Sequence, residues 1–255
     1  MRKRHAIVLA LVLAAALVTT VLLWPRSSTR AAATTPTVVS TTVRAIPKPA
    51  LTHPFQAADA VVPQIAVYGT PDVATEPIIT LTNPTPEDVP LTLLVKGQGP
   101  SGWLLVQYNR RPNGATGWIR ADDVVQRGVD DRIVVSVEQK QLTVYKGTTD
   151  EVVFQAPVAT GKANTPTPLG NFYIDVVVKL LHPTGVYGAY QLSVAAFSDV
   201  LQNFGGGPGQ MAIHGTNQPE LIGTAASNGC VRMTNEDVIA LAAIAPAGTP
   251  VSVVA

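Results

Sequence analysis

The sequence predicts a mainly β protein with one clear helix near its C-terminus, preceded by an apolar N-terminal helix. Three observations carry this prediction. Short runs rich in β-branched and aromatic residues recur between Pro, Asn and Gly turns from about residue 58 onward. Residues 234–245 combine a helix start signal with an apolar face, and a Pro-Ala-Gly stop follows them. Residues 6–24 form an almost unbroken apolar run behind a basic cluster.

The N-terminal run is long enough to cross a bilayer. Arg2, Lys3 and Arg4 precede it, and only Thr19 and Thr20 interrupt it. We therefore expect residues 1–24 to be a signal anchor or transmembrane helix in the cytoplasmic membrane, with its N-terminus in the cytoplasm. A cleaved signal peptide is the alternative. In either case the body of the protein is extracytoplasmic, tethered by this helix or secreted.

Residues 25–57 are rich in Thr, Ala and Pro and lack apolar periodicity, which predicts an extended linker. The charge is uneven along the chain. Residues 1–57 hold seven basic and no acidic residues, residues 58–127 five basic and seven acidic, and residues 128–255 six basic and ten acidic. Because the expected folded part is mildly acidic, nucleic acid is not an expected partner.

Residues 58–127 are expected to form a small β module. Its strands are predicted at 78–82, 91–95 and 102–108, and the Asn113-Gly114 pair indicates a hairpin turn before 116–119. The run GWLLVQY…NGATGWIRADDV resembles bacterial SH3-like modules, which implies a small SH3-like β-barrel. Such modules bind wall material in many proteins, and a simple spacer is the open alternative. Trp103 and Trp118 are expected in its core.

A second domain is expected over residues 130–255. Its predicted strands are 132–137, 141–146, 151–159, 171–178, 191–194, 211–214 and 250–254. The helix should start at Thr234 or Asn235, with Glu236 and Asp237 in its first turn, where acidic side chains complement the helix dipole.

The chain has a single cysteine, so no intramolecular disulfide can form. Cys230 follows Gly229 in the segment Ser-Asn-Gly-Cys-Val-Arg, and His214 ends the run Met-Ala-Ile-His. A thiol and an imidazole suffice for covalent acyl transfer, because the imidazole can take the thiol proton and later protonate a leaving amine. Spacing alone is weak evidence, and a small buried hydrophobe is the alternative for Cys230.

The four histidines are scattered, and no Cys/His or carboxylate cluster has metal-ligand spacing, so neither a metal nor a cofactor is expected. His182 is expected on the surface. The Gly205–Gly209 run lacks the context of a phosphate loop and is expected to form a lid or a tight turn before His214.

The sequence motifs around Cys230 and His214 are more specific evidence of function than the spacing of the two residues. HGT…SNGCVRM, together with ATGK…TPTPLGNF, the helix start at Asn235 and the closing segment GTPV, resembles the YkuD-type L,D-transpeptidases over nearly all of residues 130–255. The resemblance implies a YkuD-like β-sandwich catalytic domain with one or two helices. It also implies the activity, which is cysteine acyl transfer on the stem peptides of cell-wall peptidoglycan.

The resemblance assigns roles residue by residue. Cys230 matches the nucleophile and His214 the general base, which a backbone carbonyl at Gly215 would orient. Ser227, Asn228 and Gly229 match the loop that shapes the pocket and supports an oxyanion. Arg232 matches a position that steadies the loop or contacts a substrate carboxylate. Beyond the motif, Tyr190 is a candidate substrate contact, with Tyr187 beside it, although core packing is equally open for both.

Asn228 stands where many members of the family have a second histidine, so the activity should titrate mainly with Cys230 and His214. A low-pKa thiolate is expected for the first step, with His214 as the means of lowering the thiol pKa.

The implied reaction releases the terminal D-residue and forms a 3→3 cross-link with a neighbouring stem amine. The family's covalent reaction with carbapenem β-lactams is expected here too. Three alternatives stay open: the same acyl-enzyme resolved by water or by a protein lysine, a non-catalytic wall-binding module, and a structural protein that dimerises through Cys230.

Overall fold

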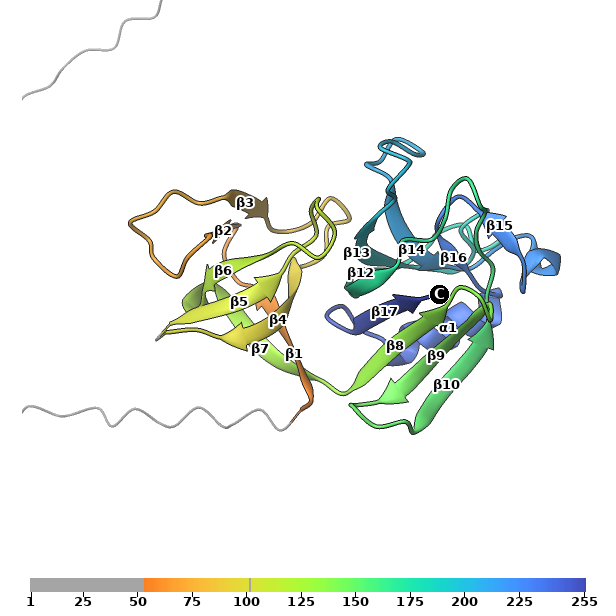
Figure 1. The fold of residues 1–255 in the computed structure, drawn as a ribbon, viewed down its shortest axis with the longest axis horizontal. Coiled ribbons are helices and arrows are strands. Elements are labelled where there is room, and N and C mark those ends of the chain that lie inside the picture. The colour runs from red at the N-terminus through yellow and green to blue at the C-terminus, as the bar shows by residue number, and fades with distance from the viewer. Residues whose placement is uncertain (1–52, 101) are drawn as a thin grey trace, which may run out of the picture. The chain divides into compact units, whose positions relative to one another are not determined.

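A computed structural model describes residues 53–100 and 102–255, and they form a mainly β protein with a single α-helix, α1 (Asn235–Ile244) (Figure 1). The predicted membrane helix and most of the predicted linker lie outside these residues. Within them, no helix is long and apolar enough to cross a membrane.

The strands divide into two main sheets and two small two-stranded pieces. The strands before residue 130 are β1 Phe55–Ala60, β2 Gln64–Val67, β3 Ile79–Thr82, β4 Thr92–Gln98, β5 Trp103–Gln107, β6 Thr116–Arg120 and β7 Val124–Val129. The later strands are β8 Asp131–Ser136, β9 Gln141–Lys146, β10 Val152–Pro157, β11 Thr160–Gly161, β12 Gly170–Lys179, β13 Tyr190–Phe197, β14 Gln210–His214, β15 Ala225–Ser227, β16 Val231–Arg232 and β17 Pro250–Val254.

The N-terminal sheet is antiparallel and has the order β6-β5-β4-β1-β7, with the hairpin β2–β3 beside it. Alternating apolar residues of these strands form a separate core that includes Ile65, Leu93, Leu104 and Ile119. Trp103 is buried as expected and meets the Tyr68 ring edge-on at 5.4 Å between centroids. Trp118, also expected in the core, is only half-buried. β1 begins at Phe55, so this strand includes the last three residues of the stretch expected to be linker.

The C-terminal sheet is mixed and has the order β10-β9-β8-β17-β12-β13-β14-β16. Instead of the two stacked layers of the expected sandwich, it is one sheet that curls around its own core (Figure 1). The physical reason lies in β12 and β13, whose registers shift between Ile174 and Val176 and between Ser193 and Phe197. Such bulges bend strands and increase their twist, so one sheet can enclose a core without a second layer.

Helix α1 packs against β13 and β14 through Val238 and Leu241, both fully buried. Thr234 is its N-cap, because the Thr234 hydroxyl accepts a hydrogen bond from the Asp237 amide at 3.1 Å. The helix therefore starts where the sequence predicts.

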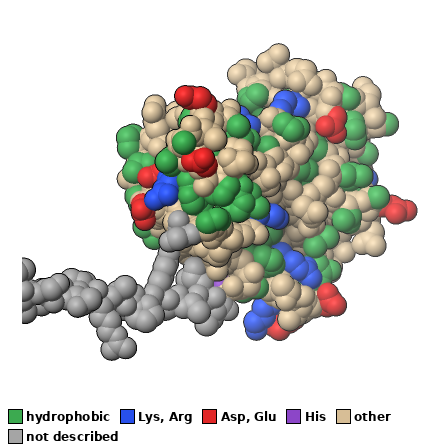
Figure 2. All heavy atoms as spheres, turned by 60° about the vertical axis from the view of Figure 1, so that its left-hand side comes forward, with side chains coloured by type: hydrophobic (Ala, Val, Ile, Leu, Met, Phe, Trp, Pro, Cys, Tyr) green, Lys and Arg blue, Asp and Glu red, His purple; other side chains and the backbone are tan. Residues whose placement is uncertain are grey.

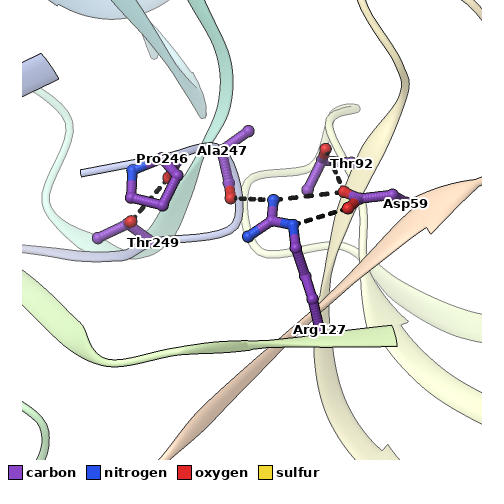
Figure 3. Close-up of polar contacts among 6 residues, drawn as sticks. All are labelled: Asp59, Thr92, Arg127, Pro246, Ala247 and Thr249. Carbon is purple, nitrogen blue, oxygen red and sulfur yellow. Dashed lines mark hydrogen bonds and ion pairs between the residues drawn. The ribbon is translucent and has the colours of Figure 1, made fainter. Parts of the chain in front are cut away.

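Side chains link the two sheets at several points. The Arg127 guanidinium pairs with Asp59 at 2.6 Å within the N-terminal sheet and donates to the Ala247 carbonyl at 2.5 Å, just beyond α1 (Figure 3). Thr92 donates to the same carboxylate at 2.7 Å, so both oxygens of Asp59 are used. Charged side chains of both signs lie scattered over the face shown in Figure 2, and no basic stripe crosses that face.

Candidate active site

Strand pairing brings His214 and Cys230 to one pocket. His214 ends β14, which runs parallel to β16 with His214 opposite Arg232, and Cys230 immediately precedes β16. The three side chains line the same pocket together with Tyr187. The structure therefore assembles the thiol, the imidazole and the guanidinium that the sequence singled out.

The backbone fixes the His214 ring. Its Nδ1 lies 2.6 Å from the Gly215 carbonyl oxygen, and the His214 side chain is buried. Because a carbonyl oxygen only accepts, Nδ1 must carry the proton, which leaves Nε2 as the acceptor. The Tyr187 ring packs against the imidazole at 4.9 Å between centroids. The orienting carbonyl at Gly215 lies where the family resemblance expected it.

Burial keeps the thiol and the imidazole neutral. It lowers the pKa of His214 to about 4, against the opposing hydrogen bond to Gly215, and the Arg232 charge lowers it further. Burial also raises the pKa of Cys230, although a backbone hydrogen bond from Ala212 and the Arg232 charge act the other way. The expected low-pKa thiolate is therefore wrong for the resting site, because desolvation outweighs the nearby charge.

The cysteine turn, residues 227–230, is closed by its own side chain. The fully buried Ser227 hydroxyl donates to the Cys230 carbonyl at 2.5 Å and accepts from the Gly229 amide at 3.1 Å. Gly229 has a φ of +115°, which an L side chain rarely adopts. Ser227 and Gly229 thus support the loop, and the Gly229 amide is not free for an oxyanion. Asn228 lines both of the pockets that Cys230 lines.

Arg232 faces the pocket with an unsatisfied donor. Its buried Nε has no hydrogen-bond partner, and its guanidinium forms no ion pair within residues 53–100 and 102–255. Its backbone exchanges two hydrogen bonds with Ala159, at 2.8 and 2.9 Å. The backbone therefore steadies the loop while the side chain is available to an anionic group.

The two tyrosines have different surroundings. Tyr190 is half-buried, packs against the core of the C-terminal sheet and accepts the Gly215 amide through its carbonyl at 3.3 Å. Tyr187 is 38% exposed and lines the pocket. Of the two, Tyr187 is therefore the better placed to meet a substrate. The signal that separates them is that Tyr187 lies in a glycine-flanked loop and Tyr190 begins a strand.

Asn235 has a role that its place in the helix motif did not reveal. Its side chain accepts from the Ala189 amide at 3.1 Å and donates to the Pro183 carbonyl at 3.0 Å. A Cβ at Gly188 or Gly215 would lie 2.1 or 2.2 Å from its Oδ1, so both positions must be glycine. Asn235 thus fastens the loop that carries Tyr187 to the base of α1. His182, in the same loop, is exposed as expected.

Within the described part of the chain, no three His, Cys, Asp or Glu side chains form a group that could hold a metal ion. A half-buried thiol, an imidazole of fixed tautomer and an unpaired guanidinium in one pocket define the site of a cysteine acyl-transfer enzyme.

Comparison with known proteins agrees with this class. The YkuD family model, described as an L,D-transpeptidase catalytic domain, matches residues 130–253. YkuD of Bacillus subtilis, named for L,D-transpeptidase activity, is 39% identical over 155 residues, which cover 58% of this chain and 84% of that protein. The Bacillus licheniformis protein of the same name is 43% identical over 122 residues, covering 48% and 64%. The chain belongs to the YkuD family of cysteine-dependent L,D-transpeptidases.

Among solved structures, L,D-transpeptidase 3 of Mycobacterium tuberculosis with a faropenem-derived adduct overlays with a TM-score of 0.43 and 13% identity. The overlay covers 65% of this chain and 91% of that one, and it is too loose to support residue-level comparison. The family model begins at residue 130, so it does not identify the strands before that residue.

Proposed function

We propose that this protein is a peptidoglycan L,D-transpeptidase that forms 3→3 cross-links through a Cys230 thioester. The observation that carries the proposal is the shared pocket of Cys230, His214 and Arg232, in which the His214 tautomer leaves Nε2 as a base. The substrate class follows from the family to which residues 130–253 belong.

The first half-reaction starts from the neutral pair. As the Cys230 sulfur attacks the carbonyl between the L-centre and the terminal D-residue, His214 Nε2 takes the thiol proton. The tetrahedral intermediate collapses when the imidazolium protonates the leaving amine. The D-residue departs and a thioester remains. Since both groups are neutral at rest, proton transfer accompanies attack and no ion pair has to persist in the buried site.

Two further groups have proposed roles in this step. The Arg232 guanidinium pairs with the carboxylate of the terminal D-residue, which would satisfy its orphaned Nε. The developing oxyanion is met by the amide of Cys230, with the Asn228 side chain nearby, because the Gly229 amide already donates to Ser227.

In the second half-reaction, the amine of a neighbouring stem peptide attacks the thioester, and His214 takes its proton. The C–S bond then breaks, and the imidazolium returns that proton to the departing Cys230 sulfur. Water in place of the amine would make the protein an L,D-carboxypeptidase, and a protein lysine would make it a wall-anchoring enzyme. The transpeptidase is favoured because the site is buried. His214 is 3% exposed, and a dry thioester favours aminolysis by a bound amine over hydrolysis.

The setting of the domain is also a proposal. Residues 1–24 anchor the chain in the cytoplasmic membrane, residues 25–57 serve mainly as a linker, and the N-terminal strands form an SH3-like module. The catalytic domain then works on the cell-wall face of the membrane. Carbapenem β-lactams, whose ring carbonyl is an acyl donor, are expected to acylate Cys230.

Intact-mass spectrometry after incubation with a carbapenem tests the nucleophile, with the Cys230→Ala variant as control. The wild type should gain one adduct and the variant none. A paired disaccharide-tetrapeptide assay then separates the acceptors. Cross-linked dimer indicates transpeptidation, while tripeptide without dimer would establish the carboxypeptidase instead. Freshly reduced wild type that gains no adduct would overturn the acyl-enzyme altogether.

A further inference from the structure

One loop, Ser198–Gly209, covers the thiol. Ser198, Leu201, Phe204 and Gly209 line the hollow that Cys230 also lines. Phe204 lines the His214 and Arg232 pocket as well, and its side chain is 43% exposed. The position of this active-site loop therefore decides how open both approaches to Cys230 are.

The active-site loop has few bonds of its own. Ser198 and Gly209 join its two ends through an amide–carbonyl bond of 2.8 Å, and the Ser198 hydroxyl accepts from the Leu201 amide at 3.0 Å. At the tip, Phe204 and Gly207 exchange two backbone hydrogen bonds of 2.9 Å. None of residues 199–208 is buried. Segments with so little burial open at low free energy unless something else holds them.

The holding group comes from the N-terminal sheet. In the β5–β6 turn, residues 108–115, Arg111 donates from Nη1 to the Ser198 carbonyl at 2.9 Å. From Nη2 it donates to the carbonyls of Leu201 and Pro208, at 3.2 and 3.1 Å. One guanidinium thus joins the outgoing and the returning arm of the active-site loop, and it also stacks 5.0 Å above the Phe197 ring.

Asn113, in the same turn, fixes the residue from which the loop departs. Its amide nitrogen donates to the Phe197 carbonyl at 2.8 Å, and its amide oxygen accepts from the Phe197 amide at 2.8 Å. Phe197 ends β13 next to the register shift of that strand. The Asn113 side chain therefore takes the place of a backbone partner where the strand leaves its ladder.

We infer that Arg111 and Asn113 are positioning residues that set the active-site loop over Cys230. The N-terminal sheet thereby controls access to the thiol of a domain to which it contributes no reacting group. The inference rests on the proposed function, because it takes Cys230 to be the nucleophile over which the active-site loop is positioned. It deepens that function by giving the N-terminal strands a part in catalysis that wall binding or spacing alone would not require.

The test compares full-length Arg111→Ala with Arg110→Ala, a matched control in the same turn. Among the described residues, the Arg110 guanidinium donates only to the neighbouring Asn109 carbonyl. Amide hydrogen exchange over residues 198–209 and alkylation of Cys230 by iodoacetamide are measured on each folded protein. For Arg111→Ala, loop exchange and alkylation should both rise by about tenfold, because three charge-assisted hydrogen bonds are lost. Arg110→Ala should match the wild type.

Turnover adds a second readout. Arg111→Ala should lower kcat/KM for the acyl donor by about tenfold through misplacement of the loop, and Arg111→Lys should recover part of it. If Arg111→Ala does not fold, Asn113→Ala tests the same loop through its departure point. Equal exchange and alkylation in the Arg111 and Arg110 variants would overturn the inference. Neither the exchange measurement nor the alkylation measurement needs cross-linking activity. Their result therefore does not depend on whether the proposed function is correct.

Discussion

Two turns of this protein use side-chain hydrogen bonds in opposite ways. The cysteine turn closes on itself, since both bonds of the Ser227 hydroxyl stay within residues 227–230. The β5–β6 turn reaches outward, since Arg111 and Asn113 bond to backbone atoms 84 to 97 residues away along the chain. The two bonds of the Ser227 hydroxyl hold the cysteine turn from within, and the Ser227 carbonyl also accepts from the Lys162 amide at 3.1 Å. The outward turn acts only when the partner sheet is docked.

This difference suggests a division of labour. The self-closed turn carries the thiol, whose placement must be constant, and the outward turn holds a loop whose placement can vary. Each turn also adjoins a buried titratable group. His214 shares the pocket of the cysteine turn, while Asp175 is buried in the C-terminal sheet and accepts hydrogen bonds from Asn109 and Gln210.

The harshest test of this division is His214→Gln, which leaves both turns intact and removes the base. Loss of general-base catalysis should lower kcat/KM by about 10²–10⁴-fold. Exchange over the active-site loop should stay at the wild-type value, because no bond to that loop involves His214. In the wild type, the acid limb of kcat/KM should fall near pH 4 and not near 6.5, since burial lowers the pKa of His214 to about 4. An acid limb at 6.5 would contradict the neutral resting pair.

The contributions of His214 and Asp175 to the stability of the protein should change with pH in opposite directions. His214, with a pKa of about 4 folded and 6.5 unfolded, binds fewer protons in the folded state, so its contribution to stability falls as the pH drops from 6.5 to 4. Burial raises the pKa of Asp175 from 3.8 to about 7, so its contribution falls as the pH rises through that interval.

Variants of the two groups separate these contributions. Between pH 4 and 6.5, the unfolding free energy of Asp175→Asn should rise with pH relative to wild type, and that of His214→Gln should fall. Each slope should change by about 1.4 kcal/mol per pH unit. Urea unfolding at several pH values measures them. If the unfolding free energies of both variants change with pH in parallel with that of the wild type, folding does not shift the pKa values of Asp175 and His214 in opposite directions.

A smaller effect is expected from Ser227→Ala, which opens the self-closed turn without touching a reacting group. The Gly229 amide loses its acceptor and the Cys230 carbonyl its donor, so the unfolding free energy should drop by about 1–3 kcal/mol. Acylation by a carbapenem should slow as the thiol moves. Ser193→Ala, at a buried serine of β13, is the control. Normal acylation in Ser227→Ala would show that self-closure does not place Cys230.

The fate of the sequence predictions follows the same division. The Cys230–His214 pairing, the Gly215 carbonyl and the Thr234 cap were predictable, because each depends on neighbours in the chain or on a family motif. The neutral resting pair was not, since burial is a property of the folded site. Asn113 was expected only as a turn former, and the partners of Arg111 could not be named, because they appear only when two separate sheets dock.

The curled single sheet was missed for a related reason. Strand runs predict that a sheet forms, but the bulges in β12 and β13 arise from register, which depends on pairing partners far along the chain. The strands that the sequence predicted were placed to within a few residues, and the segments at 141–146 and 250–254 were placed without error. The strands β1, β2 and β7 were not predicted.

The last prediction concerns Arg127, the other arginine that joins the two sheets (Figure 3). Arg127→Ala removes a half-buried ion pair with Asp59 and a bond to Ala247. It should lower the unfolding free energy by about 1–2 kcal/mol, discounted for partial exposure. Lys146→Ala, which breaks an exposed pair with Glu151, should cost less than about 0.5 kcal/mol.

The decisive comparison is with Cys230 access. Arg127 bonds near the end of α1 and makes no hydrogen bond to the active-site loop, so Arg127→Ala should destabilise the protein while the Cys230 alkylation rate of the folded protein stays unchanged. If alkylation rises as much as in Arg111→Ala, then docking of the sheets as a whole governs the loop. If it rises only in Arg111→Ala, control of the thiol is local to the β5–β6 turn. Arg127 then contributes to stability, and Arg111 controls access to Cys230.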